Sequence, residues 1–241
     1  YDFALPPLVL PALTAADLEP LAHWLQIRPQ NTVTVLDTHD GIGIVDVGVS
    51  DLRPGEPGLL SPEQIDALVE AIHTNSGGTS RTATGAAASN LDLYQVNCTL
   101  YDALGRDDRR HLLARLLQLF VPGVPQVYYV GLLAGGNDVE LLAATRVGRD
   151  VNRHHFTPAQ LEADLARPVV AATLDALRLR REHPAFAGTF TWDVHGTTAR
   201  LQWRHGDDEA TLELDVADAG FTVTATVDGA VRAVLSSSSL A

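Results

Sequence analysis

The sequence predicts an α/β fold, in which buried strands alternate with helices, followed by a small module of antiparallel strands. Two apolar runs, Val33 to Leu36 and Val124 to Val130, have the unbroken hydrophobicity of strands covered on both faces, as in a parallel sheet. From about Thr189 onward, apolar and polar residues alternate with a period of two, which is typical of antiparallel strands with one solvated face. Each apolar run precedes a long irregular stretch, and α/β barrels build their sites from such loops.

Short apolar segments open the chain. Tyr1 to Leu5 is interpreted as a short strand that Pro6-Pro7 closes. Leu8 to Leu13 and Leu18 to Ile27 are predicted helices, with Pro20 restricted to a first turn or a kink.

The next predicted helix begins at Ser61-Pro62-Glu63-Gln64, which combines a capping box with proline at the first helical position. The apolar residues that follow recur at helical spacing: Ile65, Leu68, Val69 and Ile72. Thr74 to Asn90 is rich in small and polar residues without periodicity, and a long loop inside a compact domain usually carries function.

The second half of the α/β part repeats this order. Asp107 to Phe120 is a predicted helix that Pro122-Gly123 ends, and the buried strand from Val124 follows. Gly131 to His155 is predicted to be irregular. Thr157-Pro158-Ala159-Gln160 is another capping box, and a longer helix is predicted from Pro168 to Glu182.

The last 50 or so residues carry the antiparallel pattern. Asp228-Gly229 is a hairpin turn signal within it. The apolar positions that alternate with polar neighbours are Leu201 and Trp203, then Leu212, Leu214 and Val216, then Phe221, Val223, Ala225 and Val227.

Composition limits the class of protein. The net charge of −13 argues against a nucleic-acid backbone or an anionic membrane surface as a partner. Cys98 is the single cysteine of the 241 residues, so no intrachain disulfide forms, which fits a reducing compartment such as the cytoplasm. The chain has no methionine, so translation cannot start at Tyr1, and we expect it to be a piece of a longer protein.

The candidate site lies where the first buried strand ends, at Asp37-Thr38-His39-Asp40-Gly41-Ile42-Gly43. Our hypothesis is that His39 and Asp40 face a sugar ring, because glycoside chemistry needs carboxylates beside an oxocarbenium-like transition state. The planar fork of Arg149 could bind a hydroxyl or orient a carboxylate. The aromatic rings available to stack on a pyranose are Tyr94, Tyr128 and Phe156.

Each of these residues has a second interpretation. Asp40 could cap a solvated turn, and Arg149 and Asp150 could form a surface pair of little value. Tyr128 lies within the predicted strand, where a core position is favoured. Cys98 is interpreted as a small core residue rather than a nucleophile.

A basic cluster stands out against the acidic whole: Arg146, Arg149, Arg153, His154 and His155. It could hold phosphate, although solvated charges beside a helix are the more common case. No cofactor or metal is expected, because Gly41-Ile42-Gly43 lacks the third glycine of a dinucleotide fingerprint and the adjacent histidines lack zinc-site spacing.

Five segments together resemble one family. They are Tyr1 to Pro7, Leu36 to Gly43, Thr84 to Asn97, Pro122 to Tyr129 and Gly148 to His154. The sequence is similar, over essentially residues 1–190, to sucrose phosphorylases, which belong to the α-amylase clan of retaining glycoside enzymes. The resemblance implies the C-terminal part of a (β/α)8 TIM barrel, strands six to eight with a long loop insertion, followed by a small antiparallel β domain.

The resemblance also implies the reaction and its participants. A glucosyl unit would pass from sucrose to phosphate with retention, giving glucose 1-phosphate and fructose through a covalent glucosyl-enzyme. Asp40 would be the transition-state stabiliser, while His39 and Arg149 would contact the glucose. Asp92, Tyr94 and Gln95 would form the acceptor loop that chooses between fructose and phosphate.

One departure from the family pattern is serious. The family's nucleophile Asp and acid/base Glu lie on strands four and five, upstream of the strand that Tyr1 begins. We therefore expect this chain to lack both residues and to be inactive alone. The predicted division is a barrel part at residues 1–187, with the insertion at about 41–106, and a β domain at 188–241.

Several alternatives stay open at this point. Within the enzyme class, the substrate could be sucrose 6′-phosphate or glucosylglycerate, or the enzyme could be a plain sucrose hydrolase. From another class, the chain could be a naturally shortened, non-catalytic protein that binds sugars. The sequence does not decide the oligomeric state, for which a homodimer is one option.

Overall fold

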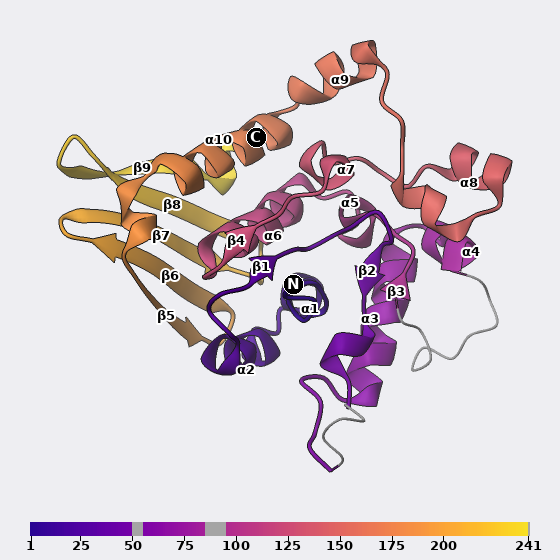
Figure 1. Cartoon of the computed structure of the whole chain (residues 1–241), viewed down its shortest axis with the longest axis horizontal. Helices are drawn as coiled ribbons and strands as arrows, with labels where there is room; N and C mark the ends of the chain where they lie inside the picture. Colours follow the sequence, from indigo (N-terminus) through magenta and orange to yellow (C-terminus); the bar gives the residue numbers. More distant parts are fainter. Residues whose placement is uncertain (50–54, 85–94, 241) are drawn as a thin grey trace.

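The computed structural model describes residues 1–49, 55–84 and 95–240. A helical part surrounds a short parallel pairing of strands, and a five-stranded antiparallel sheet packs beside it (Figure 1). The helices are α1 Leu5–Thr14, α2 Glu19–Ile27, α3 Pro62–Asn75, α4 Thr79–Thr84, α5 Leu100–Ala103, α6 Asp108–Phe120, α7 Tyr129–Leu132, α8 Val139–Thr145, α9 Pro158–Leu165 and α10 Pro168–Glu182. The strands are β1 Val33–Thr34, β2 Ile42–Gly43, β3 Gln95–Val96, β4 Val124–Pro125, β5 Thr189–His195, β6 Thr198–His205, β7 Asp208–Asp215, β8 Gly220–Val227 and β9 Ala230–Ser236. Short 3₁₀ turns are η1 Val45–Val47, η3 Gly148–Asn152, η4 Pro184–Ala187 and η5 Ser237–Leu240.

The predicted capping signals begin helices where expected. Ser61 accepts a hydrogen bond from the Gln64 amide at 3.3 Å, and the Gln64 side chain accepts one from the Ser61 amide at 2.8 Å. Thr157 and Gln160 form the same box at the start of α9. Such caps satisfy amides that the first turn leaves unpaired, and each contributes about 1 kcal/mol. The predicted helix at Pro168 to Glu182 is confirmed as α10.

Three segments far apart in the sequence pair in parallel. Asp2 bridges Thr34, and β1 pairs with β4 in the register Val33 to Val124 and Thr34 to Pro125. Helices α1 and α2 connect the first segment to β1, and α3 to α6 lie between β1 and β4. Parallel neighbours need such crossovers, so the predicted order of strand, helix and strand is confirmed here.

The predicted lengths of these strands were wrong. β1 covers two residues of the predicted four, and Val124 of β4 is 68% exposed rather than buried. Among the described residues β4 pairs only with β1, which leaves its other edge open, and the chain then turns into α7. The predicted opening strand shrinks to the single bridge at Asp2, because Pro6 and Pro7 fit within the first turn of α1.

The two stretches predicted to be irregular contain short helices. α4 lies in the first stretch and α7, α8 and η3 lie in the second. No residue of α8 is buried, although Val139, Leu142 and Ala143 recur at helical spacing. α4 is held instead by polar contacts, in which the Ser80 hydroxyl lies 2.7 Å from both His73 Nδ1 and Ser76 Oγ.

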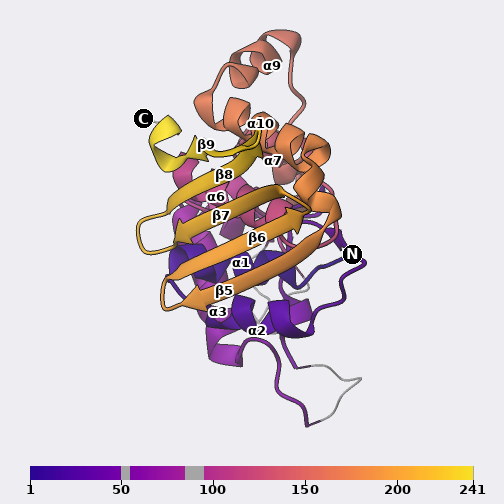
Figure 2. The ribbon, with the colours of Figure 1, turned by 90° about the vertical axis from the view of Figure 1, so that its left-hand side faces the viewer.

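The C-terminal sheet is a meander in the order β5-β6-β7-β8-β9, and Figure 2 shows one of its faces with the helical part behind it. The predicted alternation is confirmed: apart from Val227 at the end of β8, the named apolar positions are buried. Asp228 and Gly229 join β8 to β9, both with positive φ, as a two-residue hairpin turn of this kind requires. The indole N–H of Trp203 donates to the Phe120 carbonyl at 2.6 Å, which ties the sheet to the end of α6.

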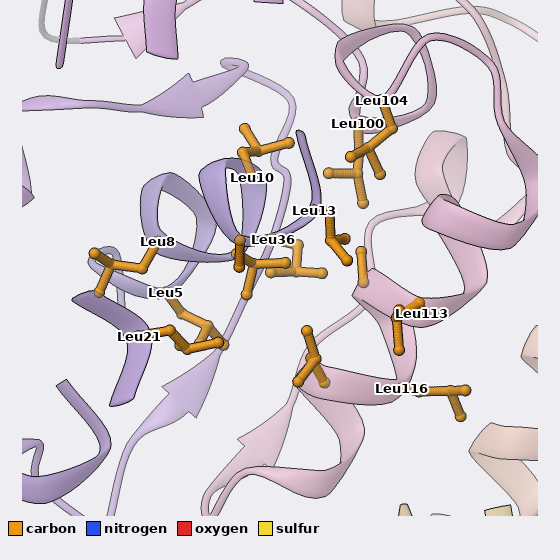
Figure 3. Close-up of a cluster of buried hydrophobic side chains, with 14 of the residues drawn as sticks. Leu5, Leu8, Leu10, Leu13, Leu21, Leu36, Leu100, Leu104, Leu113 and Leu116 are labelled. Atoms are coloured by element: carbon orange, nitrogen blue, oxygen red, sulfur yellow. The ribbon is translucent and has the colours of Figure 1, made fainter. Parts of the chain in front are cut away.

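One continuous core joins these parts. Figure 3 shows leucines from α1, α2, α5 and α6 converging on Leu36, the second residue after β1. Burying one such side chain contributes about 1.5–3 kcal/mol relative to leaving it in water. The core therefore anchors the root of the segment that carries His39 and Asp40.

Candidate active site

A cavity of about 320 Å³ opens at the C-terminal end of β1. Its walls come from the segment after β1, from the first residues of the chain and from the residues that follow β4. The lining residues are Tyr1, Phe3, Pro6, Val35, Leu36, Asp37, Thr38, His39, Asp40, Gly41, Gly43, Asp46, Gln95, Gln126 and Tyr128. The cavity thus lies where parallel strands deliver polar side chains, as the sequence predicted.

A tight turn presents His39 and Asp40 at this cavity. The Asp40 amide donates to Thr38 Oγ1 at 3.1 Å, and the Gly41 amide donates to the Thr38 carbonyl at 3.3 Å. Gly41 has a φ of +108°, and a Cβ there would lie 2.3 Å from the Val96 carbonyl oxygen. Glycine is therefore required at position 41, so that β2 can pair with β3 beside the turn.

Three cationic or polar groups surround the Asp40 carboxylate. Arg149 Nη1 lies 3.1 Å from Asp40 Oδ1, and Arg153 Nη2 lies 3.3 Å from the same oxygen. His39 Nε2 lies 3.4 Å from the other oxygen, Oδ2. The Asp40 side chain is 29% exposed, so the carboxylate is held in place while one side stays open to solvent and to the cavity.

The contacts of Arg153 were missed by sequence reasoning. Its Nε donates to the His39 carbonyl at 3.1 Å, and its Nη1 lies 3.2 Å from Asp150 Oδ1. The guanidinium fork thus connects η3 to the turn after β1. The sequence did contain a signal for this role, because Arg153 lies in the same motif as Arg149, Gly148 to His154. From the sequence, Arg153 was interpreted only as a member of the basic cluster.

A buried ion pair beneath the turn was also missed. Arg115 Nη2 lies 2.7 Å from Asp37 Oδ1, and the side chains are 0% and 4% exposed. Burial raises the pKa of Asp37, while the charge and the hydrogen bond of Arg115 lower it. The available signal was a row of polar residues at helical spacing, His111, Arg115 and Gln118, among the leucines of α6.

The remaining candidates divide into three groups. Gln95 lines the cavity, whereas Asp92 and Tyr94 lie outside the described residues. Tyr128 lines the cavity and is only partly buried, so the core interpretation was wrong; its hydroxyl donates to the Asn152 carbonyl at 3.0 Å. Phe156 packs against Tyr129 and His154 and does not line the cavity.

The basic cluster separates in the structure. Arg149 and Arg153 contact Asp40, whereas His154 Nδ1 lies 2.6 Å from Asp138 Oδ2. Arg149, Arg153 and His154 are therefore each in contact with a carboxylate. These contacts do not support a phosphate site built from the whole cluster.

Other chemistries find little support in the described part of the chain. No group of three or more histidine, cysteine or acidic side chains there is arranged to hold a metal ion. Burial raises the pKa of the Cys98 thiol to about 12, which agrees with the core interpretation of this residue. None of the described helices has the length and hydrophobicity that crossing a membrane requires.

Comparison with known proteins shows strong similarity to one group of enzymes. The chain is 54% identical over 226 residues to a sucrose phosphorylase from Agrobacterium vitis, covering 93% of this chain and 46% of the relative. It is 53% identical to a sucrose phosphorylase from Bifidobacterium adolescentis, covering 89% of this chain and 43% of the relative. No model of a protein family matches the chain.

A solved structure shows the same arrangement of the backbone. The crystal structure of sucrose 6F-phosphate phosphorylase from Thermoanaerobacter thermosaccharolyticum superposes with a TM-score of 0.84 at 34% identity. The match covers 98% of this chain and 47% of the solved chain. The chain thus spans about half the length of the relatives that it matches.

Proposed function

We propose that this chain, a homologue of the C-terminal part of sucrose phosphorylases, is the C-terminal portion of an enzyme that transfers glucose from sucrose to phosphate. The products would be glucose 1-phosphate and fructose. The observation that carries the proposal is the Asp40 carboxylate, held by Arg149 and Arg153 beside a cavity at the end of a parallel strand. The identity of 54% over 93% of the chain supports it.

The chemistry would be a double displacement that retains the anomeric configuration. A carboxylate nucleophile attacks the anomeric carbon, the bond to fructose breaks, and a carboxylic acid gives its proton to the fructose oxygen. A phosphate oxygen then attacks the anomeric carbon, the bond to the nucleophile breaks and restores its carboxylate, and the proton of the phosphate passes to the acid/base residue. We propose that the nucleophile and the acid/base lie in a part of the enzyme outside this chain.

The residues of this chain would act on the charge that develops during both steps. The Asp40 carboxylate would stabilise the oxocarbenium-like transition state, in which positive charge spreads over the anomeric carbon and the ring oxygen. Arg149 would orient this carboxylate and contact the glucose, and His39 would donate a hydrogen bond to a glucose hydroxyl. Asp92, Tyr94 and Gln95 are proposed as the acceptor loop.

The same proposal interprets the architecture. The segment at Asp2, β1 and β4 would be strands six to eight of a (β/α)8 barrel, since they pair in parallel in chain order. Residues 1–187 would belong to the barrel and 188–241 to a separate β domain. The reaction as proposed needs no cofactor, and a cytoplasmic location and a homodimer are compatible with it.

Phosphate dependence tests the proposal. The full-length protein that carries this chain is incubated with sucrose in the presence and absence of phosphate, and fructose, glucose and glucose 1-phosphate are quantified. We expect glucose 1-phosphate and fructose in equal amounts, with little free glucose. Free glucose formed at the same rate without phosphate would indicate a hydrolase and contradict the proposal.

The acceptor is the second question, because the solved relative acts on sucrose 6F-phosphate. The same assay with sucrose 6′-phosphate and with glucosylglycerate compares the alternatives directly. Sucrose should have the highest kcat/KM of the three substrates. A higher value for either alternative would keep the reaction type and correct the substrate.

A further inference from the structure

The turn that carries Asp40 begins next to the buried ion pair of Asp37 and Arg115, and the proposed reaction assigns this pair no role. We propose that Asp37 and Arg115 are positioning residues, whose ion pair fixes the root of the turn and thereby the place of the Asp40 carboxylate. This inference rests on the proposed function, since it concerns the same site.

The ion pair lies beside the cavity that Asp40 lines. Asp37 precedes Asp40 by three residues, lines the same cavity and has its Oδ1 atom 2.7 Å from Arg115 Nη2. A shift of the Asp37 backbone would move the whole turn, because Thr38 accepts hydrogen bonds from the amides of Asp40 and Gly41 and so holds the turn together. The orientation of the Asp37 side chain is therefore coupled to the position of the carboxylate above it.

Arg115 is itself held by a network that reaches the other wall of the cavity. Its Nη1 donates to Gln118 Oε1 at 3.0 Å. The Gln118 side-chain amide donates to the carbonyls of Thr34 in β1, at 2.9 Å, and of Gln126, at 2.8 Å. The network thus ties the end of β1 to the segment after β4 at the level of the cavity.

The backbone of α7 closes over the pair. A Cβ at Gly131 would lie 1.9 Å from Arg115 Nη2 and 1.9 Å from Asp37 Oδ2, so only glycine fits. His111 Nε2 lies 2.9 Å from the Gly131 carbonyl and holds this backbone in place. The backbone at Gly131 packs against both side chains, and Gln118 holds the Arg115 guanidinium, so these contacts fix the geometry of the ion pair.

A buried ion pair of this kind contributes little net free energy to folding. The desolvation of two charges offsets most of their attraction, and apolar residues of similar size often serve stability equally well. Directionality is different, since a charge-assisted hydrogen bond orients its partners and apolar contacts do not. The contribution of this pair should therefore appear in the geometry of the site.

The chain contains a matched control in the ion pair between Asp2 and Arg28, beside β1. Arg28 Nη2 lies 2.7 Å from Asp2 Oδ2, and both side chains are 0% exposed. Arg28 also donates to the Pro122 carbonyl at 2.8 Å, and the Asp2 amide donates to the Val33 carbonyl. This pair has the same chemistry and similar burial, but neither Asp2 nor Arg28 lines the cavity.

The experiment compares the two pairs in the full-length protein that carries this chain. The double variants Asp37→Leu/Arg115→Met and Asp2→Leu/Arg28→Met each replace an ion pair by apolar side chains. Urea unfolding is measured for both, together with kcat, KM for sucrose and the pH dependence of kcat. The single variants Asp37→Asn and Arg115→Lys keep the shape of the site, so they report on positioning if the Asp37→Leu/Arg115→Met protein does not fold.

We expect the Asp37→Leu/Arg115→Met variant to lose about 10²-fold in kcat, the scale of a catalytic group misplaced by about 1 Å. KM should stay near the unmodified value, and the inflections of the pH profile should not move. Arg115→Lys, which keeps the charge without the fork, should recover part of the rate. The Asp2→Leu/Arg28→Met variant should change the urea midpoint with little effect on kcat.

Other outcomes overturn the inference in distinguishable ways. An unchanged kcat in folded Asp37→Leu/Arg115→Met, or in both single variants, would make the pair structural only. An equal loss of kcat from both double variants would indicate general damage to the fold. A rise in KM with constant kcat would make Asp37 a substrate ligand. An unmodified protein without phosphorolysis would overturn the proposed function first, and the positioning role with it.

Discussion

At the scale of single residues, the arrangement of charge around Asp40 explains how one carboxylate could act on a transition state. Both arginines approach Oδ1, at 3.1 and 3.3 Å, and these two contacts fix the direction of the carboxylate. A preorganised charge of this kind costs no reorganisation when the positive charge develops. A neutral amide of the same shape would keep the place and lose the charge.

We therefore predict that Asp40→Asn in the full-length protein lowers kcat by about 10²-fold or more, the scale for removing a preorganised electrostatic group. Steady-state phosphorolysis of sucrose measures this loss. Asp175→Asn is the control, because Asp175 pairs with Arg178 on the exposed face of α10, far along the chain from the turn. Wild-type kinetics in Asp40→Asn would reject the role assigned to this residue.

His111 makes a second prediction, about pH. Burial beside Arg115 lowers the pKa of His111 to about 3, whereas the pKa in an unfolded chain lies near 6.5. Between these values the unfolded state binds a proton that the folded state excludes, so the free energy of unfolding falls as the pH is lowered. The loss approaches about 1.4 kcal/mol per pH unit well below pH 6.5.

Urea unfolding at pH 7 and pH 5 measures this effect. His111→Gln can still donate a hydrogen bond to the Gly131 carbonyl, and we expect it to lose less stability on acidification than the unmodified protein. His195→Gln serves as the control, because it makes the same substitution at a side chain that is 83% exposed. An identical acid loss in His111→Gln and the unmodified protein would contradict the argument.

Sequence reasoning reached some of these residues and not others for a physical reason. His39, Asp40 and Arg149 lie in polar segments that follow apolar runs, where a charged side chain invites a functional interpretation. Arg115 lies among the leucines of α6, and no local pattern tells whether a buried arginine there has a partner. Its partner, Asp37, is 78 residues away.

At the scale of elements, the strength of the local signal decided which predictions succeeded. α3, α9 and α10 have capping boxes or a proline at the start, and their predicted starts were confirmed. The C-terminal strands were confirmed because period-two alternation needs no knowledge of distant partners. The failure at β4 is of the opposite kind, since burial of Val124 depends on which strand lies at its open edge.

The helical turn α7 provides a prediction about packing. Gly131→Ala should destabilise the full-length protein by about 1–3 kcal/mol, because the new Cβ would overlap Asp37 and Arg115. Urea unfolding measures the change. The control is Gly43→Ala, whose added Cβ would meet only Asp46 Oδ2 at 3.4 Å. Equal stabilities for the two variants would show that the pair tolerates movement of α7.

At the scale of the whole molecule, the two parts share one core, and this core supports a site that uses residues from both halves of the chain. Asp40 follows β1, while Arg149 and Arg153 come more than 100 residues later. Tyr1 and Val124, at opposite sides of the parallel pairing, are each 68% exposed. We propose that further strands of the complete enzyme cover these edges.

This proposal predicts the behaviour of residues 1–241 expressed alone. Without the proposed nucleophile and acid/base, the isolated chain should show no phosphorolysis of sucrose, and its exposed apolar edges should promote aggregation. Size-exclusion chromatography and the glucose 1-phosphate assay measure both properties. Clean phosphorolysis by the isolated chain would show that its own residues complete the active site.

The most direct measurement follows the anomeric configuration of the glucose 1-phosphate that forms during turnover. The full-length protein that carries this chain is incubated with sucrose and phosphate in an NMR tube, and the ³¹P spectrum identifies the anomer of glucose 1-phosphate as it forms. We predict the α-anomer, because two displacements retain the configuration of the glucosyl unit of sucrose. Formation of the β-anomer, or release of free glucose with no sugar phosphate, would contradict a retaining phosphorylase.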